Sequence, residues 1–227
     1  MEQGEKLSTV ATALGSAIKA AVTNDVADKV TATRVNMDTV NLIIESWGDL
    51  PKKSAKQTIE KYGLPNEASQ SRLTWYNNGP WKRTVVLRDE IPHNFPQPHT
   101  DVIENFIDYK VPIELYGEIA KYDGSVVIER TRGEVSARCD MEAANFIALN
   151  LMHDIVTGKY NAEEARKAYG EITSAYLMSR PAPYAEALQF TVTAEDTKDR
   201  DETKIAGAML HQTGEKIKDI VTGRNES

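Results

Sequence analysis

The segment from residue 141 to 156 constrains the fold most, because it is a helical sequence that is apolar on nearly all sides. Nine apolar residues surround the expected helix: Ala143, Ala144, Phe146, Ile147, Leu149, Leu151, Met152, Ile155 and Val156. A helix without a polar face belongs inside a protein. Asp140 is expected to cap its start, and Gly158 follows its end. We therefore predict a largely buried central helix.

Two hairpin signals predict a small antiparallel sheet. Residues 72–77 and 81–88 are strand-like and flank Asn78-Gly79, a dipeptide that tolerates the positive φ of a tight turn. Residues 125–131 and 134–139 flank Arg132-Gly133 in the same way. Within the second strand, alternation is expected to place Trp81 on a buried face with Val85 and Leu87. Because the helices are segregated from the sheet, the predicted class is α+β.

The first 47 residues have the apolar spacing of two helices. Apolar residues recur at coiled-coil steps over residues 7–21 and again over 26–47, and the phase breaks at residues 23–25. This predicts an N-terminal helical hairpin. The two apolar seams fit either association with a partner or burial against the protein's own sheet.

Three regions are expected along the chain. They are an N-terminal helical pair (1–48), an α+β core domain (49–193), and a charged linker with a C-terminal amphipathic helix (194–227). Within the core domain the spacing predicts further helices over 51–62, 113–121 and 161–178, and a last strand over 189–193.

Charge and composition narrow the partners. The chain has 227 residues, of which 41% are hydrophobic and 27% charged, as in ordinary globular proteins. Its net charge of −7 argues against nucleic acid as the main partner. Residues 50–88 are the exception, since they carry eight lysines and arginines against two glutamates. A protein partner or self-association is therefore expected more than a small-molecule substrate.

The compartment follows from what the sequence lacks. No stretch has the run of about 20 apolar residues needed to span a bilayer. The acidic start MEQGEK is unlike the basic beginning of a signal peptide. A soluble, cytoplasmic protein is expected by default, and an exported one if N-terminal residues had been trimmed.

The first hairpin combines aromatic and cationic residues. Trp75, Tyr76, Trp81 and Arg83 lie close to its turn. Stacking rings with cations suit an anionic partner surface, a glycan or single-stranded nucleic acid. The alternative is that the tryptophans fill the core while the cations reach solvent. We take these four residues as the expected binding face of a non-catalytic binding protein.

The stretch RDEIPHNFPQPHTD is the densest cluster of reactive side chains. His93 and His99, together with Asp101, could supply three ligands of a divalent metal with open positions. No recognised spacing such as His-Glu-x-x-His is present. Asp101 also has a competing role, because with Glu104 it forms a capping box for an expected helix over 101–107. The stretch is thus either a stiff connector or the site of a metal-dependent hydrolase, the alternative function.

A single cysteine, Cys139, excludes an internal disulfide and a cysteine-rich zinc site. It directly precedes Asp140, the expected cap of the central helix. A thiol at a helix N-terminus can have a lowered pKa and act as a nucleophile. The alternative is a small buried apolar residue.

Three strings carry a resemblance to a known family. YGLPNEASQSRLTWYNNGPWKRTVV, PHTDVIENFIDYKVP and ARCDMEAANFIALNLMHDIVTGK resemble a family of uncharacterised bacterial proteins over about residues 45–170. That resemblance implies no particular activity. Residues 51–88, a helix followed by Gly63-x-Pro65 and a strand with Trp75, are similar to small outer-membrane-assembly lipoproteins of the BamE/SmpA kind. This second resemblance implies an exported module that binds other proteins.

Overall fold

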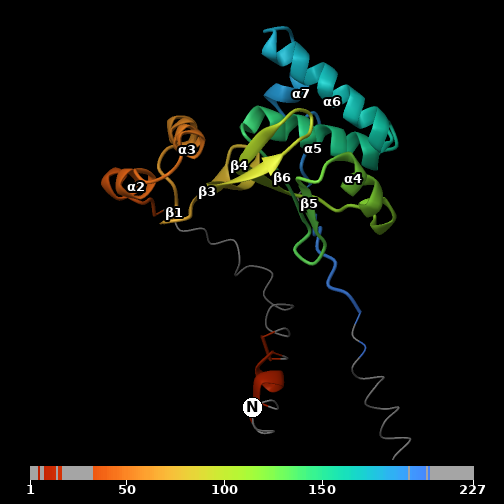
Figure 1. The fold of residues 1–227 in the computed structure, drawn as a ribbon. Helices are drawn as coiled ribbons and strands as arrows, with labels where there is room; N and C mark the ends of the chain where they lie inside the picture. The colour runs from red at the N-terminus through yellow and green to blue at the C-terminus, as the bar shows by residue number, and fades with distance from the viewer. Residues whose placement is uncertain are drawn as a thin grey trace, which may run out of the picture.

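The computed structural model describes residues 33–193, the shorter stretches 8–13, 15–16 and 195–202, and the single residues Glu5 and Lys204. Its centre is a six-stranded antiparallel sheet in the order β1-β2-β3-β4-β6-β5 (Figure 1). The strands are β1 (Glu67–Ser69), β2 (Arg72–Asn78), β3 (Trp81–His93), β4 (His99–Asp108), β5 (Val126–Glu129) and β6 (Glu134–Cys139). With its helices segregated from this sheet, the chain has the predicted α+β class.

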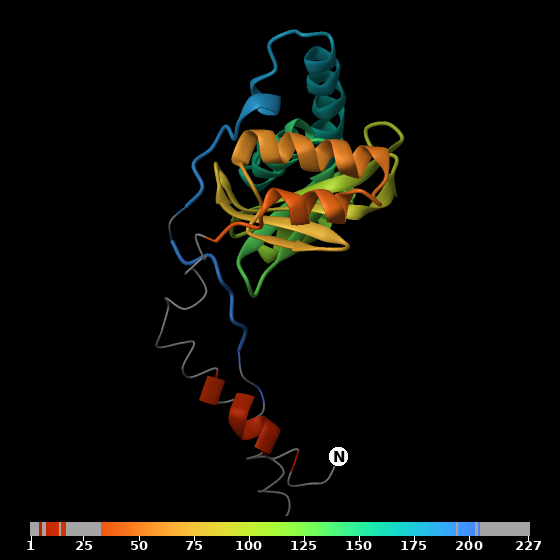
Figure 2. The ribbon, with the colours of Figure 1, turned by 90° about the vertical axis from the view of Figure 1, so that its left-hand side faces the viewer.

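The helices cover one face of the sheet. They are α2 (Met37–Ile44), α3 (Asp49–Tyr62), η1 (Ile113–Leu115), α4 (Tyr116–Tyr122), α5 (Glu142–Val156), α6 (Ala162–Leu177) and α7 (Pro183–Glu186). α2, α3 and α5 pack on the sheet, and α6 and α7 lie on the outside of α5 (Figures 1 and 2). None of the described helices is long and apolar enough to cross a membrane. The strand expected over 189–193 is wrong, because these residues are irregular.

Helix α5 is the predicted buried central helix. It buries ten of its fifteen residues, including the polar Asn145. The Asn145 amide donates hydrogen bonds to Ile103 O at 3.1 Å and to Asn105 Oδ1 at 2.7 Å, so α5 is bonded to the middle of β4. The expected cap at Asp140 is wrong, since Met141 occupies the N-cap position and no side chain caps the helix.

Two apolar clusters lie under the helices. The larger one packs β3 to β6 against α5. In it the ring centroids of Trp81 and Phe146 are 4.5 Å apart. The smaller one joins α2 and α3 to β2, β3 and β4 through Val40, Ile44, Trp47, Ala55, Leu73, Trp75, Val86 and Ile103. In the described part of the second N-terminal segment, Val40, Ile44 and Trp47 are therefore buried against the protein's own sheet, whereas Met37 is exposed.

The N-terminal helical pair is only partly within the described residues. α2 begins at Met37 with Asn36 as its N-cap, so the helix expected from residue 26 does not include residues 33–36. The pairing of the two expected helices lies outside the described residues.

Both predicted hairpins form. Asn78 pairs with Trp81 across the turn Gly79-Pro80, and Gly79 has a φ of 72°. β5 and β6 turn at Gly133, with a φ of 65°. Glycine accepts this left-handed conformation without the steric cost that a Cβ would bring.

The predicted faces of β3 are wrong in one respect. Trp81 is buried in the cluster under α5, whereas Arg83, Val85 and Leu87 line a hollow of about 630 Å³ on the other face. Strand and turn residues, among them Tyr76, line that hollow. We call it the open-face hollow.

The helix expected over 101–107 is also wrong, because these residues form strand β4 between β3 and β6. In this strand Ile103 pairs with Val86 on one side and with Cys139 on the other. Alternation then turns Asp101 and Asn105 toward the helices together with Ile103. Asp101 is a buried residue of a central strand, so it is not a helix cap.

Candidate metal centre

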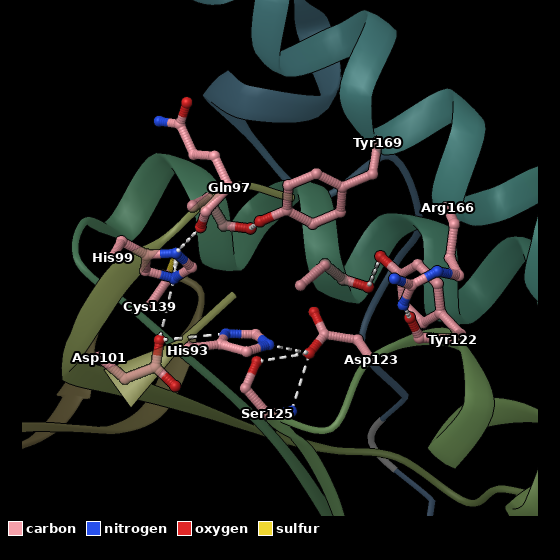
Figure 3. A network of polar contacts seen from close by, with 12 residues as sticks. His93, Gln97, His99, Asp101, Tyr122, Asp123, Ser125, Cys139, Arg166 and Tyr169 are labelled. Carbon is pink, nitrogen blue, oxygen red and sulfur yellow. Dashed lines mark hydrogen bonds and ion pairs between the residues drawn. The ribbon is translucent and has the colours of Figure 1, made fainter. Parts of the chain in front are cut away.

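The three predicted ligands converge at one end of the β3–β4 hairpin. β3 ends at His93 and β4 begins at His99, and these two residues pair directly in the register. Asp101 is two residues further along β4, on the same face as His99. The ring centroids of the two histidines are 4.9 Å apart, and both rings face the Asp101 carboxylate (Figure 3). The proline-rich stretch is thus mostly strand, with a loop of residues 94–98.

The distances within the cluster match those of metal ligands. Asp101 Oδ1 lies 3.1 Å from His99 Nε2 and 3.4 Å from His93 Nδ1. One potential ligand atom from each residue lies within 4.8 Å of the others. Zinc bonds of about 2.0–2.1 Å in a tetrahedron place neighbouring ligand atoms about 3.3–3.4 Å apart. Two of the three separations are already close to that value.

Hydrogen bonding alone does not account for these contacts. Asp101 Oδ1 and His93 Nδ1 are buried and make no hydrogen bond of acceptable geometry, although they are at ion-pair distance. His99 Nδ1 donates to the Gln97 carbonyl at 2.7 Å, because a carbonyl can only accept. In that tautomer His99 Nε2 is an acceptor, and the Cys139 S–H at 3.3 Å is its donor. Asp101 Oδ1 has no such donor, and a cation between it and the two rings would satisfy it.

Outer contacts orient both imidazoles. The Gln97 carbonyl fixes the His99 ring, as just described, and Asp123 Oδ1 lies 3.6 Å from His93 Nε2 (Figure 3). Asp123 Oδ1 is itself held by the backbone N–H and hydroxyl of Ser125, at 2.8 and 2.7 Å. A carboxylate or carbonyl behind each imidazole is typical of metal-bound histidines.

The site is a low-dielectric environment. The Asp101 side chain is only 2% exposed, and burial raises the pKa of its carboxyl group, against the positive charges of His93, His99 and Arg138. A buried carboxylate is therefore costly in the protein alone, and a bound cation would offset that cost.

Cys139 lies beside the cluster on strand β6. Its Sγ is 3.3 Å from His99 Nε2 and 3.4 Å from Asp140 Oδ1. Burial, reinforced by the negative charge of Asp140, raises the pKa of the thiol well above its ordinary value. This argues against the nucleophile interpretation, because the thiol stays protonated at neutral pH. A cavity of about 40 Å³ borders Cys139, His99 and Tyr169.

Aromatic packing immobilises the loop between the two histidines. The Phe95 ring lies 5.0 Å from Tyr169 on α6 and 6.2 Å from Tyr122 on α4. The Arg166 guanidinium stacks on it at 3.9 Å and donates a hydrogen bond of 2.7 Å to the Tyr122 carbonyl. The ligand positions are therefore supported by two helices as well as by the sheet.

The expected binding face of the first hairpin does not form a common surface. Trp75 and Trp81 are 0% and 1% exposed, so neither ring offers a stacking surface, which corrects the prediction for these two residues. Their indole N–H groups donate to the Gly63 carbonyl and to the Glu142 carboxylate. The core alternative accounts for both rings.

Tyr76 and Arg83 line the open-face hollow instead. Arg83 stacks on the Phe106 ring at 3.8 Å and bonds Glu134 at 2.8 Å. Burial would raise the pKa of Glu134, but hydrogen bonds and charges from Arg83 and Lys82 outweigh it and lower that pKa.

Three features of the candidate metal centre were missed in the sequence: Gln97, Asp123 and the proximity of Cys139 to His99. Asp123 precedes Gly124-Ser125, and its side chain accepts from the backbone two residues ahead. That pattern is the ordinary signal of a turn, so it gave no reason to join Asp123 to a histidine thirty residues away.

The chain matches no protein-family model, no curated protein and no solved structure. The side chains of the site are therefore the basis for inferring a function.

Proposed function

We propose that the protein binds one divalent transition-metal ion through His93, His99 and Asp101. The observation that carries the proposal is the buried Oδ1 of Asp101, which makes no hydrogen bond and faces a ring nitrogen from each histidine at 3.1 and 3.4 Å. A buried polar atom without a hydrogen bond requires an explanation, and an ion at the centre of three ligands provides one.

The ligand types indicate the class of ion. Two imidazoles and one carboxylate favour zinc and its neighbours among the transition metals, whereas calcium and magnesium prefer oxygen ligands. The ion would hold β3 and β4 together at the end of their hairpin. We therefore propose a non-catalytic role, in which the metal stabilises this end of the sheet.

The hydrolase alternative needs a metal-bound water and room for a substrate. The cavity of about 40 Å³ beside His99 accommodates a water molecule and offers little enclosed space for a substrate. Hydrolysis of 4-nitrophenyl acetate by the zinc-loaded wild type, but not by the His99→Ala variant, would support the hydrolase alternative.

Metal titration tests the proposal directly. Full-length protein, freed of metal with a chelator, is titrated with zinc while bound metal is measured by elemental analysis after dialysis. We expect one zinc per chain in the wild type, and none in His93→Ala or His99→Ala. His153→Gln is the matched control, since His153 contacts Tyr109 and Phe190 away from the cluster and its loss should leave zinc binding unchanged.

A wild-type protein that takes up no zinc would contradict the proposal. The cluster would then be a hydrogen-bonded network in which a proton, instead of a metal ion, lies between Asp101 and His99.

A second candidate function is self-association through the open-face hollow. Its volume of about 630 Å³ and the presence there of Tyr76 and Arg83 favour it. Sedimentation over a range of protein concentrations should show a dimer that Tyr76→Lys disrupts. Met178→Lys, an exposed position on the far side of α5, serves as the control. A wild type that stays monomeric at every concentration would rule this out.

A further inference from the structure

We propose that Cys139 is the fourth ligand of this ion, so that the centre is a closed His₂-Asp-Cys site selective for zinc-class metals. The inference rests on the metal binding proposed above and goes beyond it, because it assigns the remaining coordination position to a thiolate rather than to water. It also links a third strand, β6, to the two that carry the other ligands.

The geometry places the sulfur next to the cluster. Cys139 pairs with Ile103 of β4, two residues from Asp101, and points to the same face of the sheet. Its Sγ is 3.3 Å from His99 Nε2. Zinc bonds of about 2.3 Å to sulfur and about 2.0 Å to nitrogen in a tetrahedron separate the two ligand atoms by about 3.5 Å. The sulfur is thus at ligand distance from one of its expected neighbours.

The sulfur needs only a limited shift to complete the site. The group of potential ligand atoms within 4.8 Å of one another comprises His93, His99 and Asp101, so Cys139 Sγ has to move from its place beside His99 toward Asp101 when the ion binds. The second observation that points to a cation is independent of the cysteine: the Asp101 side chain is 2% exposed and its Oδ1 has no hydrogen bond.

Charge balance favours a thiolate over water in this position. A divalent ion bound by one carboxylate and two neutral imidazoles leaves a net charge of +1 in a buried site. When Cys139 binds, its S–H bond breaks, the proton passes to solvent, the sulfur electron pair forms the bond to the metal, and a bound water leaves. The resulting centre is neutral, which lowers the cost of burial.

Cobalt provides the test, because a thiolate bound to Co²⁺ gives an intense near-ultraviolet charge-transfer band that nitrogen and oxygen ligands do not give. The chain has a single cysteine, so any such band belongs to Cys139. Metal-free full-length protein is titrated with Co²⁺, and the zinc affinity is then measured by competition. We expect the band in the wild type at one Co²⁺ per chain.

Cys139→Ser should remove the band while Co²⁺ still binds. Its zinc affinity should fall by more than the roughly 10–100-fold that follows the loss of an outer partner. His99→Ala should lose both the band and the binding. Because the wild-type band alone decides between thiolate and water, the test holds even if Cys139→Ser folds poorly.

The two proposals fail in different ways. Co²⁺ that binds without the charge-transfer band, with the same affinity in Cys139→Ser, would overturn the assignment of Cys139 and leave the three-residue site standing. An absence of Co²⁺ and zinc binding in the wild type would overturn both.

Discussion

Replacing Asp101 by asparagine should have opposite effects on stability in the metal-free and the zinc-loaded protein. The substitution keeps the shape of the side chain and removes its charge. In the metal-free protein the Asp101 carboxylate is buried and its Oδ1 makes no hydrogen bond. Its pKa is raised by burial, so ionising it destabilises the fold as the pH rises. Asp101→Asn should therefore stabilise the metal-free protein.

The size of each effect can be worked out. An unpaired buried polar group costs about 1–3 kcal/mol, and relief of part of that cost should raise the melting temperature by about 2–6 °C for a domain of this size. Zinc at 100 times its dissociation constant should stabilise the wild type by about 2.7 kcal/mol. The variant lacks a charged ligand, so zinc should stabilise it little. The order of the two melting temperatures should reverse when zinc is added.

Thermal unfolding followed by circular dichroism, with chelator and with zinc, measures both effects. Asp154→Asn is the matched control, because Asp154 is also buried but accepts from Lys159 at 2.9 Å and from Tyr184 at 3.0 Å. That variant should be less stable than the wild type in both conditions. If Asp101→Asn behaved in the same way, Asp101 would be a charge partner of two protonated histidines, and the reasoning would be refuted.

Three further predictions concern the rest of the fold. Because the pKa of Glu134 is lowered, its ionised carboxylate stabilises the fold above about pH 4.5, and this stabilisation is lost as the pH falls. Glu134→Gln should therefore reduce the free energy of unfolding in urea by about 1–3 kcal/mol at pH 7 and by much less at pH 3. Trp75→Phe removes a buried N–H donor and should cost about 2 kcal/mol in the same assay, whereas an unchanged midpoint would mean that the indole hydrogen bond is dispensable. A Cβ at Gly133 would lie 2.4 Å from the Thr197 backbone, so Gly133→Ala should expose residues 195–202 to limited proteolysis. Gly170→Ala, with open space around its Cβ, is the control and should leave the cleavage pattern as it is.

Local patterns were enough to predict most elements of the described chain. α3, α5, α6 and both hairpins follow from periodicity and turn glycines, and α6 begins with a capping box between Asn161 and Glu164. These signals act over a few residues, so no knowledge of the tertiary structure is needed to interpret them.

Strand β4 could not be predicted, for a physical reason. Its inward face alternates Asp101 and Asn105 with isoleucines, which removes the period-two apolar pattern of a half-buried strand. The Asn105 side chain is accommodated only because Asn145 of α5 donates a hydrogen bond to it. The residues next to Asn105 in the sequence therefore give no indication that it is buried in a strand, because its partner lies forty positions away.

The same error concealed the convergence of the three candidate ligands. The residue types of His93, His99 and Asp101 left a metal site and a stiff connector as alternatives, and a helix at Asp101 would have pointed its side chain elsewhere. Once β4 is a strand paired with β3, the register alone brings the three side chains together. The position of Cys139 depends in addition on the pairing of β4 with β6, which joins segments more than thirty residues apart.

In the smaller apolar cluster, the sheet binds helix α2 much as it would bind a separate peptide. α2 contributes Val40 and Ile44 to that cluster, and Val35 donates a backbone hydrogen bond of 2.8 Å to Pro65 O. The segment thus binds through one apolar stripe and one strand-like contact, as a separate peptide ligand would. A protein cut between α2 and α3 should remain a two-piece complex, and the isolated larger piece should recapture a synthetic peptide of residues 33–48.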